Sequence, residues 1–201
     1  MTPLLTQDEL DTLAMQELPG KASTLQIGHL KQRERIALLA ERCCQKREGD
    51  LIELGVYSGD TSKILAIIAR KYGRKLICVD PFPMGTPWEL GEKIHAVFET
   101  NMRPFSDVVI FHHADAHSPE MVAEIQKRRY AFSMSDDGHE LWHHIVELRA
   151  LLPVTDGLLL ADDVYLADVE KAIDDVLPEF PGWSVLRNER LGESYLTKDM
   201  K

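Results

Sequence analysis

The sequence predicts an α/β fold: a seven-stranded, mostly parallel sheet with helices on both faces and an N-terminal helical cap. After residue 49, five short apolar runs each lead into a segment with helical periodicity. Repeated alternation of strand and helix is typical of a parallel sheet. Two further short strands close the chain, and 201 residues favour one structural domain over two.

The first 48 residues are expected to form the helical cap. Their pattern predicts a short amphipathic helix over residues 6–18, ended by Pro19 and Gly20, and a longer helix over residues 26–47. No residue type in this region indicates catalysis, so it is interpreted as a packing cap, a substrate lid or a dimer surface. Residues 49–201 then form the main domain.

From residue 50 onward, strands and helices alternate. Strands are predicted over residues 50–55, 75–80, 107–112, 130–135, 156–161, 183–187 and 193–197. Helices are predicted over residues 61–72, 89–102, 119–129, 140–151 and 168–177, with a proline-containing loop over residues 81–87. In open parallel sheets, ligands bind outside the carboxyl ends of the strands. The residues that follow each strand are therefore the candidates for function.

The composition excludes several classes of partner. Lys and Arg total 23 against 33 Asp and Glu, a formal net charge of −10 that argues against binding nucleic acid or anionic lipid. Three cysteines without zinc-like spacing predict reduced thiols and a cytoplasmic setting. No apolar run approaches the ~18–20 residues that span a bilayer, and the N-terminus lacks a secretory signal pattern.

The first strand runs into a glycine turn. Gly55 and Gly59 allow a tight bend and close approach of the backbone to a ligand. Their spacing is G-x-x-x-G, and Tyr57 stands where the dinucleotide fingerprint has its second glycine. The turn therefore disfavours NAD and FAD and favours a cofactor that carries adenosine without phosphates. The alternative is a plain strand-to-helix connection.

Acidic residues follow the second and third strands. Asp80 lies 21 residues after Gly59, where nucleoside-binding sheets hold a ribose diol. Asp115 follows the third strand and is a candidate acceptor for an adenine amino group. The alternatives are that Asp80 forms a turn and that Asp115 or Ser118 caps the next helix.

Carboxylates also follow the fourth and fifth strands. They are Asp136 and Asp137 after one strand and Asp162 and Asp163 after the other. Hard oxygen ligands from neighbouring strand ends are what Mg²⁺ or Ca²⁺ requires, and without a cation such carboxylates would repel one another. The alternative is two separate caps or solvated turns.

Four of these motifs resemble class I S-adenosylmethionine-dependent methyltransferases. They are the E-L-G-V-Y-S-G turn of residues 53–59, Val79-Asp80, Asp136, and the L-L-L-A-D-D-V strand of residues 158–164. The resemblance is strongest to the cation-dependent O-methyltransferases of the catechol and caffeoyl-CoA type. The chain is also similar to metal-dependent sugar O-methyltransferases. The likeness extends over about residues 50–198 and implies a Rossmann-like sheet whose last strand is antiparallel.

The resemblance assigns roles to individual residues. It implies that the methionine part of S-adenosylmethionine is held by Glu53, Gly55, Tyr57, Ser58, Gly59 and Thr61. It implies that Asp80 binds the ribose and that Asp115 lies beside the adenine. Asp136, Asp162 and Asp163 would hold Mg²⁺, which makes Asp136 catalytic as well.

The resemblance implies methyl transfer to the hydroxyl of a small molecule, such as a catechol or a vicinal diol of a sugar. His139 stands three residues after Asp136, where the catechol type has its catalytic lysine, and is the candidate general base. Two alternatives remain open. One is a non-catalytic module that binds S-adenosylmethionine or a nucleoside, and the other is a metal-dependent hydrolase or hydroxylase-like protein on the same fold.

Overall fold

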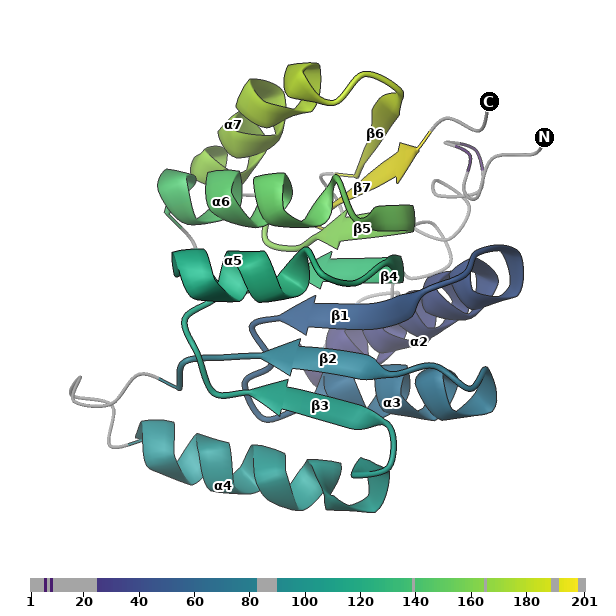
Figure 1. Cartoon of the computed structure of the whole chain (residues 1–201), viewed down its shortest axis with the longest axis vertical. Coiled ribbons are helices and arrows are strands. Elements are labelled where there is room, and N and C mark those ends of the chain that lie inside the picture. Colours follow the sequence, from purple (N-terminus) through teal and green to yellow (C-terminus); the bar gives the residue numbers. More distant parts are fainter. Residues whose placement is uncertain are drawn as a thin grey trace.

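The computed structural model describes residues 6, 8, 25–82, 90–138, 140–164, 166–188 and 192–198. Within these residues the chain folds around one seven-stranded sheet with the strand order β3-β2-β1-β4-β5-β7-β6 (Figure 1). The predicted fold class is confirmed. Among the described helices, none is long and apolar enough to cross a membrane.

The sheet is parallel except at one edge. The strands are β1 (Asp50–Leu54), β2 (Leu76–Val79), β3 (Val109–His112), β4 (Tyr130–Ser135), β5 (Thr155–Ala161), β6 (Trp183–Asn188) and β7 (Glu193–Lys198). Strand β7 inserts between β5 and β6 and is antiparallel to both. The central strands are apolar runs buried on both faces, as parallel sheets covered by helices require.

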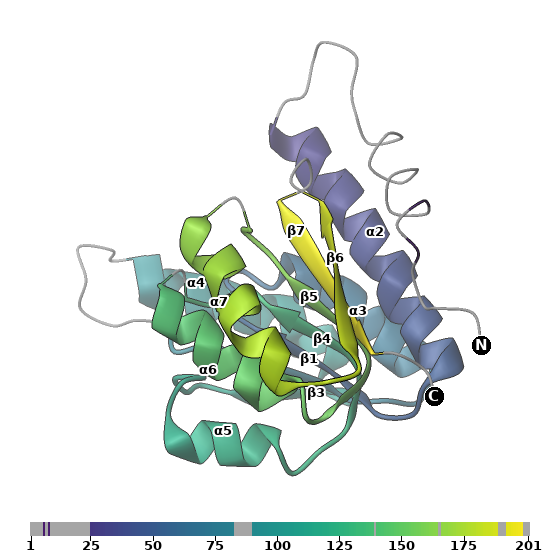
Figure 2. The same ribbon diagram turned by 90° about the horizontal axis from the view of Figure 1, so that it is seen from above.

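Helices cover both faces of the sheet (Figure 2). One side carries α2 (Leu25–Lys46), α3 (Asp60–Lys71) and α4 (Leu90–Met102), and the other carries α5 (Pro119–Ile125), α6 (Leu141–Leu151) and α7 (Ala167–Val176). Two short 3₁₀ helices follow α4 and α7, over Arg103–Phe105 and Leu177–Glu179. Each face of the sheet has its own apolar core. The strands are therefore packed between two layers of helices, which fixes the positions of their ends relative to one another.

Helix α5 ends four residues earlier than the helix predicted over residues 119–129. Beyond Ile125 the backbone hydrogen bonds join residues three positions apart instead of four, since Lys127 N donates to Glu124 O at 3.2 Å and Arg128 N donates to Ile125 O at 3.3 Å. The Arg129 carbonyl then accepts a hydrogen bond from Asp50 N on β1 at 2.9 Å, so the extended strand β4 begins at the next residue. The other described elements match their predictions within one or two residues. The predicted helix over residues 6–18 lies almost wholly outside the described residues.

Helix α2, which belongs to the expected cap, packs directly on the sheet. Ile36, Leu39, Ala40 and Cys43 are buried in the same core as β1, β4 and β5. Arg35 adds a buried ion pair: its NH2 lies 2.6 Å from Glu193 Oε1 on β7, and its Nε lies 2.7 Å from the Tyr195 hydroxyl. Helix α2 is thereby fixed across the β5–β7 side of the sheet.

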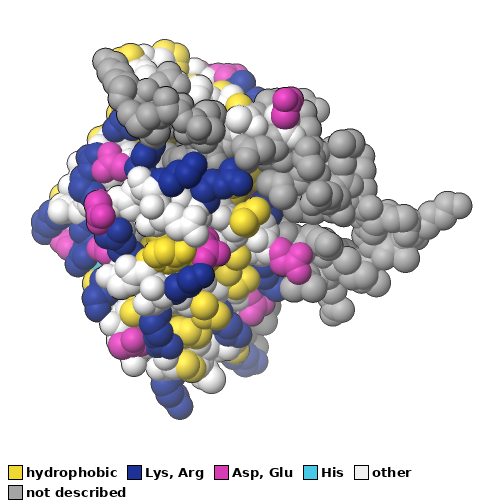
Figure 3. All heavy atoms as spheres, turned by 90° about the vertical axis from the view of Figure 1, so that its right-hand side faces the viewer, with side chains coloured by type: hydrophobic (Ala, Val, Ile, Leu, Met, Phe, Trp, Pro, Cys, Tyr) yellow, Lys and Arg dark blue, Asp and Glu magenta, His cyan; other side chains and the backbone are white. Residues whose placement is uncertain are grey.

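Ion pairs join the segments at the amino ends of the strands. They link Arg128 to Asp50, Arg129 to Asp156, Arg70 to Asp107 and Arg74 to Glu48. This is the edge that Figure 3 presents, where Lys and Arg side chains are interspersed with Asp and Glu. Acidic groups at this edge therefore have cationic partners.

The Arg35–Glu193 pair makes a direct stability prediction. Arg35→Met leaves the fully buried Glu193 carboxylate without its cation, a change that typically costs about 3–5 kcal/mol. For a chain of this size we expect Tm to fall by roughly 6–20 °C in a thermal melt followed by circular dichroism. The double variant R35M/E193Q should recover part of the loss, and an R35M variant that melts within about 2 °C of wild type would refute the role.

Candidate functional site

The glycine turn after β1 is shaped by close contact with the loop after β4. Gly55 and Gly59 have φ of 78° and 81°, and Tyr57 between them also has a positive φ of 47°. A Cβ on Gly55 would lie 2.1 Å from the carbonyl oxygen of Asp136. Only glycine fits there, because both the conformation and the backbone contact exclude a side chain. The turn and the loop that carries Asp136 are thus one packed unit.

Asp80, at the end of β2, binds the backbone of this turn. Its Oδ2 accepts bonds from Val56 N at 2.9 Å and Tyr57 N at 3.0 Å, and its Oδ1 accepts one from Phe82 N at 2.7 Å. Asp80 was expected to bind ribose. Sequence reasoning missed that its carboxylate also hydrogen-bonds the backbone of the glycine turn after β1. A carboxylate oxygen accepts more than one bond, so both roles are compatible.

The other expected cofactor residues surround the turn. Glu53 is buried on β1, accepts a bond from Ser62 Oγ at 2.6 Å, and has its pKa raised to about 8 by burial. The Ser58 carbonyl accepts a bond from Asn101 Nδ2 at 2.7 Å, Thr61 lies in the first turn of α3, and Tyr57 is exposed. Apart from the buried Glu53, these groups border the start of α3.

The three expected metal ligands follow β4 and β5 at the same edge of the sheet, although their carboxylate oxygens are not all within 4.8 Å of one another. The backbone N of Asp136 donates to Leu54 O at 3.0 Å, and the backbone N of Asp162 donates to Ser135 O at 3.1 Å. The first residue after β4 and the first residue after β5 therefore still hydrogen-bond to the neighbouring strand. Asp163 follows with a positive φ of 56°, and its N–H donates to Asp162 Oδ1 at 2.9 Å.

The electrostatics of this group are those of carboxylates held close to one another. Burial, and then the charges of Asp162 and Asp163, raise the pKa of Asp136 well above its usual value. Burial and the charge of Glu193 raise the pKa of Asp162 to about 7. Gln32 on α2 donates to Asp162 Oδ2 at 2.8 Å, a contact that sequence reasoning missed because 130 residues separate the two. A bound cation would relieve this repulsion.

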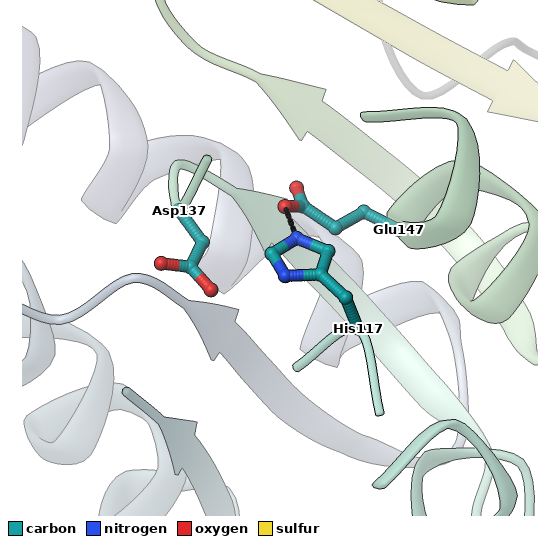
Figure 4. A group of neighbouring side chains, drawn as sticks. All are labelled: His117, Asp137 and Glu147. Carbon is teal, nitrogen blue, oxygen red and sulfur yellow. Dashed lines mark hydrogen bonds and ion pairs between the residues drawn. The ribbon is translucent and has the colours of Figure 1, made fainter. Parts of the chain in front are cut away.

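His117, Asp137 and Glu147 form a second group of side chains (Figure 4). His117 Nε2 is 2.8 Å from Glu147 Oε1, and a carboxylate oxygen of Asp137 lies within 4.8 Å of the ligand atoms of both. His117 also binds the expected adenine residue, since its backbone N and its Nδ1 lie 2.9 and 2.8 Å from Asp115 Oδ1. His117 and Glu147 carry no motif in the sequence, so only the fold could reveal this group. The expected base, His139, lies outside the described residues.

Comparisons with known proteins identify the family and support the fold. A family model described as "Methyltransferase domain" matches residues 52–164, which is more than half of the chain, and the chain belongs to this family. No curated protein matches the sequence.

Three solved structures share the fold. The apo structure of CalS11, a TDP-rhamnose 3'-O-methyltransferase of calicheamicin biosynthesis, has a TM-score of 0.64 at 16% identity, covering 95% of this chain and 92% of that one. Cofactor-bound Rv0187 from MTB gives 0.62 at 15% identity, with coverage of 94% and 88%. PaMTH1, an SAH-bound methyltransferase of Podospora anserina, gives 0.62 at 14% identity, with coverage of 96% and 88%.

Together, the fold and the family match define the class of protein. The chain is a class I S-adenosylmethionine-dependent methyltransferase, with the Rossmann-like sheet expected from the sequence. The cofactor expected from the glycine turn is S-adenosylmethionine.

Removing one carboxylate should stabilise the metal-free protein. The pKa of Asp162 is about 7 in the folded chain against about 3.9 when unfolded, so its ionisation destabilises the fold increasingly as pH rises from about 4 to about 7. In the presence of a chelator, Asp162→Asn should therefore raise stability at about pH 8, by at most about 4 kcal/mol, and change it little near pH 4. Thermal melts across this pH range provide the measurement.

Asp168→Asn is the matched control, because Asp168 is exposed on α7 and its replacement should leave the pH profile unchanged. A D162N variant no more stable than wild type at about pH 8 would mean that Asp162 is not held against other charges.

Proposed function

We propose that the chain is a divalent-cation-dependent O-methyltransferase that acts on a small molecule with neighbouring oxygen groups, such as a vicinal diol of a sugar or a catechol. The observation that carries the proposal is the group of Asp136, Asp162 and Asp163 at the carboxyl ends of β4 and β5. These acids adjoin the turn expected to hold the methyl donor, since Asp136 contacts Gly55 through its backbone.

The proposed cofactor site follows the sheet edge from β1 to β3. The turn over residues 55–59 would receive the methionine part, Asp80 the ribose, and Asp115 the adenine amino group. Asp115 is 57% exposed and holds His117 through Oδ1, which leaves Oδ2 available to a ligand. Asp80 is nearly buried and would accept a ribose hydroxyl beside its backbone bonds.

The residues of the proposed metal site fit a hard cation. The three carboxylates offer only oxygen ligands, which favours Mg²⁺ over softer metals, and the pKa values of Asp136 and Asp162 are raised above their usual values. When bound, the cation would supply Lewis-acid and template chemistry, lowering the pKa of a substrate hydroxyl and orienting it. Gln32 would keep Asp162 in position from α2.

His139 is proposed as the general base, on its place three residues after Asp136 in the sequence. A histidine suits the task because its ordinary pKa of about 6.5 lies near working pH. In this proposal, His139 takes the hydroxyl proton while the oxygen forms its bond to the methyl group and the sulfonium carbon–sulfur bond breaks.

The proposed partner is a hydroxylated small molecule. CalS11, which has a similar fold, is a TDP-rhamnose 3'-O-methyltransferase, and this likeness favours a sugar diol within this class. The net charge of −10 argues against a nucleic acid acceptor and against anionic membranes. Cys43, Cys44 and Cys78 are buried free thiols, which fits the proposed cytoplasmic setting. We also propose that the chain forms a homodimer, with residues 1–48 as the dimer surface.

Transfer of a labelled methyl group tests the proposal. The chelator-treated chain should transfer no label to catechols or nucleotide sugars, and Mg²⁺ should restore transfer, because the carboxylates alone cannot bind the acceptor oxygens. His139→Ala should lower kcat by ~10²–10⁴-fold and leave cofactor affinity within a few fold. Asp168→Asn serves as the control variant. Full turnover after chelation would reject the metal, and an H139A variant with unchanged kcat would reject the base.

Asp80→Ala tests the cofactor site. It removes the acceptor of Val56 N, Tyr57 N and Phe82 N, and we expect affinity for S-adenosylhomocysteine to fall roughly ten- to a hundredfold, as loss of about 1–3 kcal/mol implies. Asp80→Asn should lose less, since it keeps one acceptor oxygen. Isothermal titration calorimetry gives the affinities, with Asp107→Ala at the opposite edge as control. Equal affinity of D80A and wild type would remove Asp80 from the site.

A further inference from the structure

His117, Asp137 and Glu147 come from three separate segments and meet beside β4. His117 lies between β3 and α5, Asp137 follows β4, and Glu147 is on α6. One ligand atom from each lies within 4.8 Å of the other two, and Figure 4 shows the Asp137 carboxylate beside the imidazole ring. The proposed methyl transfer leaves all three side chains without a role.

This group is geometrically distinct from the neighbouring acids, although Asp136 and Asp137 are adjacent in the chain. Among the described residues, the ligand atoms that lie within 4.8 Å of one another are those of His117, Asp137 and Glu147, and Asp136 is not among them. The two adjacent carboxylates therefore belong to different sets of side chains.

We propose that His117, Asp137 and Glu147 form a binding site for a second divalent cation of the Zn²⁺ type, with Asp115 orienting the imidazole. The Nε2 atom of His117 faces Glu147 and is the nitrogen offered to the ion. The Nδ1 atom is held by Asp115 Oδ1 at 2.8 Å, and a carboxylate on the second ring nitrogen is the usual support of a metal-binding histidine.

The ligand types favour Zn²⁺ over Mg²⁺. An imidazole nitrogen with two carboxylates is a ligand set typical of zinc, whereas Mg²⁺ prefers oxygen ligands and retains several waters. An ion about 2.1 Å from each ligand atom holds those atoms at most about 4.2 Å apart. At 2.8 Å, Nε2 of His117 and Oε1 of Glu147 share a hydrogen bond and lie closer than the roughly 3.4 Å between two ligands of a tetrahedral Zn²⁺. Binding would therefore release the proton of this hydrogen bond to solvent, separate the two atoms slightly and bring the Asp137 carboxylate closer.

Burial supplies an independent reason for a cation here. The Glu147 side chain is fully buried, and Oδ2 of Asp137 is buried without a hydrogen-bond partner. A buried polar atom of this kind costs free energy unless a ligand satisfies it.

The site would stabilise the loop after β4. Glu147 accepts a long bond from Gly138 N at 3.4 Å and a bond from Ser135 Oγ, so it already contacts both sides of that loop. A cation shared by Asp137 and Glu147 would fix the segment that carries Asp136. The expected role of this cation is therefore to support the loop structurally. The proposal does not depend on whether the neighbouring acids bind Mg²⁺.

Zn²⁺ binding to the full chain tests the proposal. After removal of metals, the affinity for Zn²⁺ is measured by competition with a chromophoric chelator, in wild type and in H117Q, D137N and D136N/D162N variants. We expect one Zn²⁺ site that survives D136N/D162N and that H117Q and D137N weaken at least about tenfold. His113→Gln is the matched control, because His113 lies one residue after β3 in an aromatic cluster and should not alter Zn²⁺ affinity.

Circular dichroism would test whether each variant is folded. In thermal melts, Zn²⁺ should raise the Tm of wild type but not the Tm of H117Q. D137N keeps the proposal testable if H117Q does not fold, since Asp137 Oδ2 has no hydrogen bond to lose. Two results would overturn the proposal: Zn²⁺ binding of equal strength in wild type and D137N, or a Zn²⁺ site lost only in D136N/D162N. The latter would assign the ion to the Asp136 group and leave His117 as an imidazolium between two acids.

Discussion

Burial of carboxylates at the carboxyl ends of the central strands is the constraint on which the rest of this structure depends. Burial is the first cause of the raised pKa of Glu53, Asp136, Asp137 and Asp162, and other acids add to it in each case. At the opposite edge, exposed acids instead lie against arginines. The proposal of a cation site at the carboxyl ends of the strands is based on this contrast between the two edges.

The surrounding backbone maintains this arrangement. Gly55 lets the turn after β1 lie against the Asp136 carbonyl, and Asp80 fixes the turn from β2. From the other side, α2 supplies Gln32 to Asp162 and is itself held by the buried Arg35–Glu193 pair. The elements that position the acids therefore also border the expected cofactor site.

Much of the fold could be predicted from the sequence because its signals are local. The alternation of apolar strands and periodic helices determines the sheet, and acids placed directly after β4 and β5 must meet at one edge in any parallel arrangement. The end of α5 was missed because it depends on a bond between Arg129 and Asp50 on β1. Likewise, the Gln32–Asp162 and His117–Glu147 contacts join residues 130 and 30 positions apart, and no spacing rule connects them. Asp80 was predicted to bind ribose, but its bonds to the backbone amides of the turn could not be predicted, because they depend on the tertiary shape of the turn.

The most direct test of the account is the location of a bound ion. Crystals of the chain grown with Mn²⁺ and S-adenosylhomocysteine would be measured for anomalous scattering. The account predicts a peak within about 2.5 Å of carboxylate oxygens of Asp136 and Asp162, with the sulfur of the cofactor on the side of the Gly55–Gly59 turn. A map with bound cofactor and no anomalous peak at these carboxylates would contradict it.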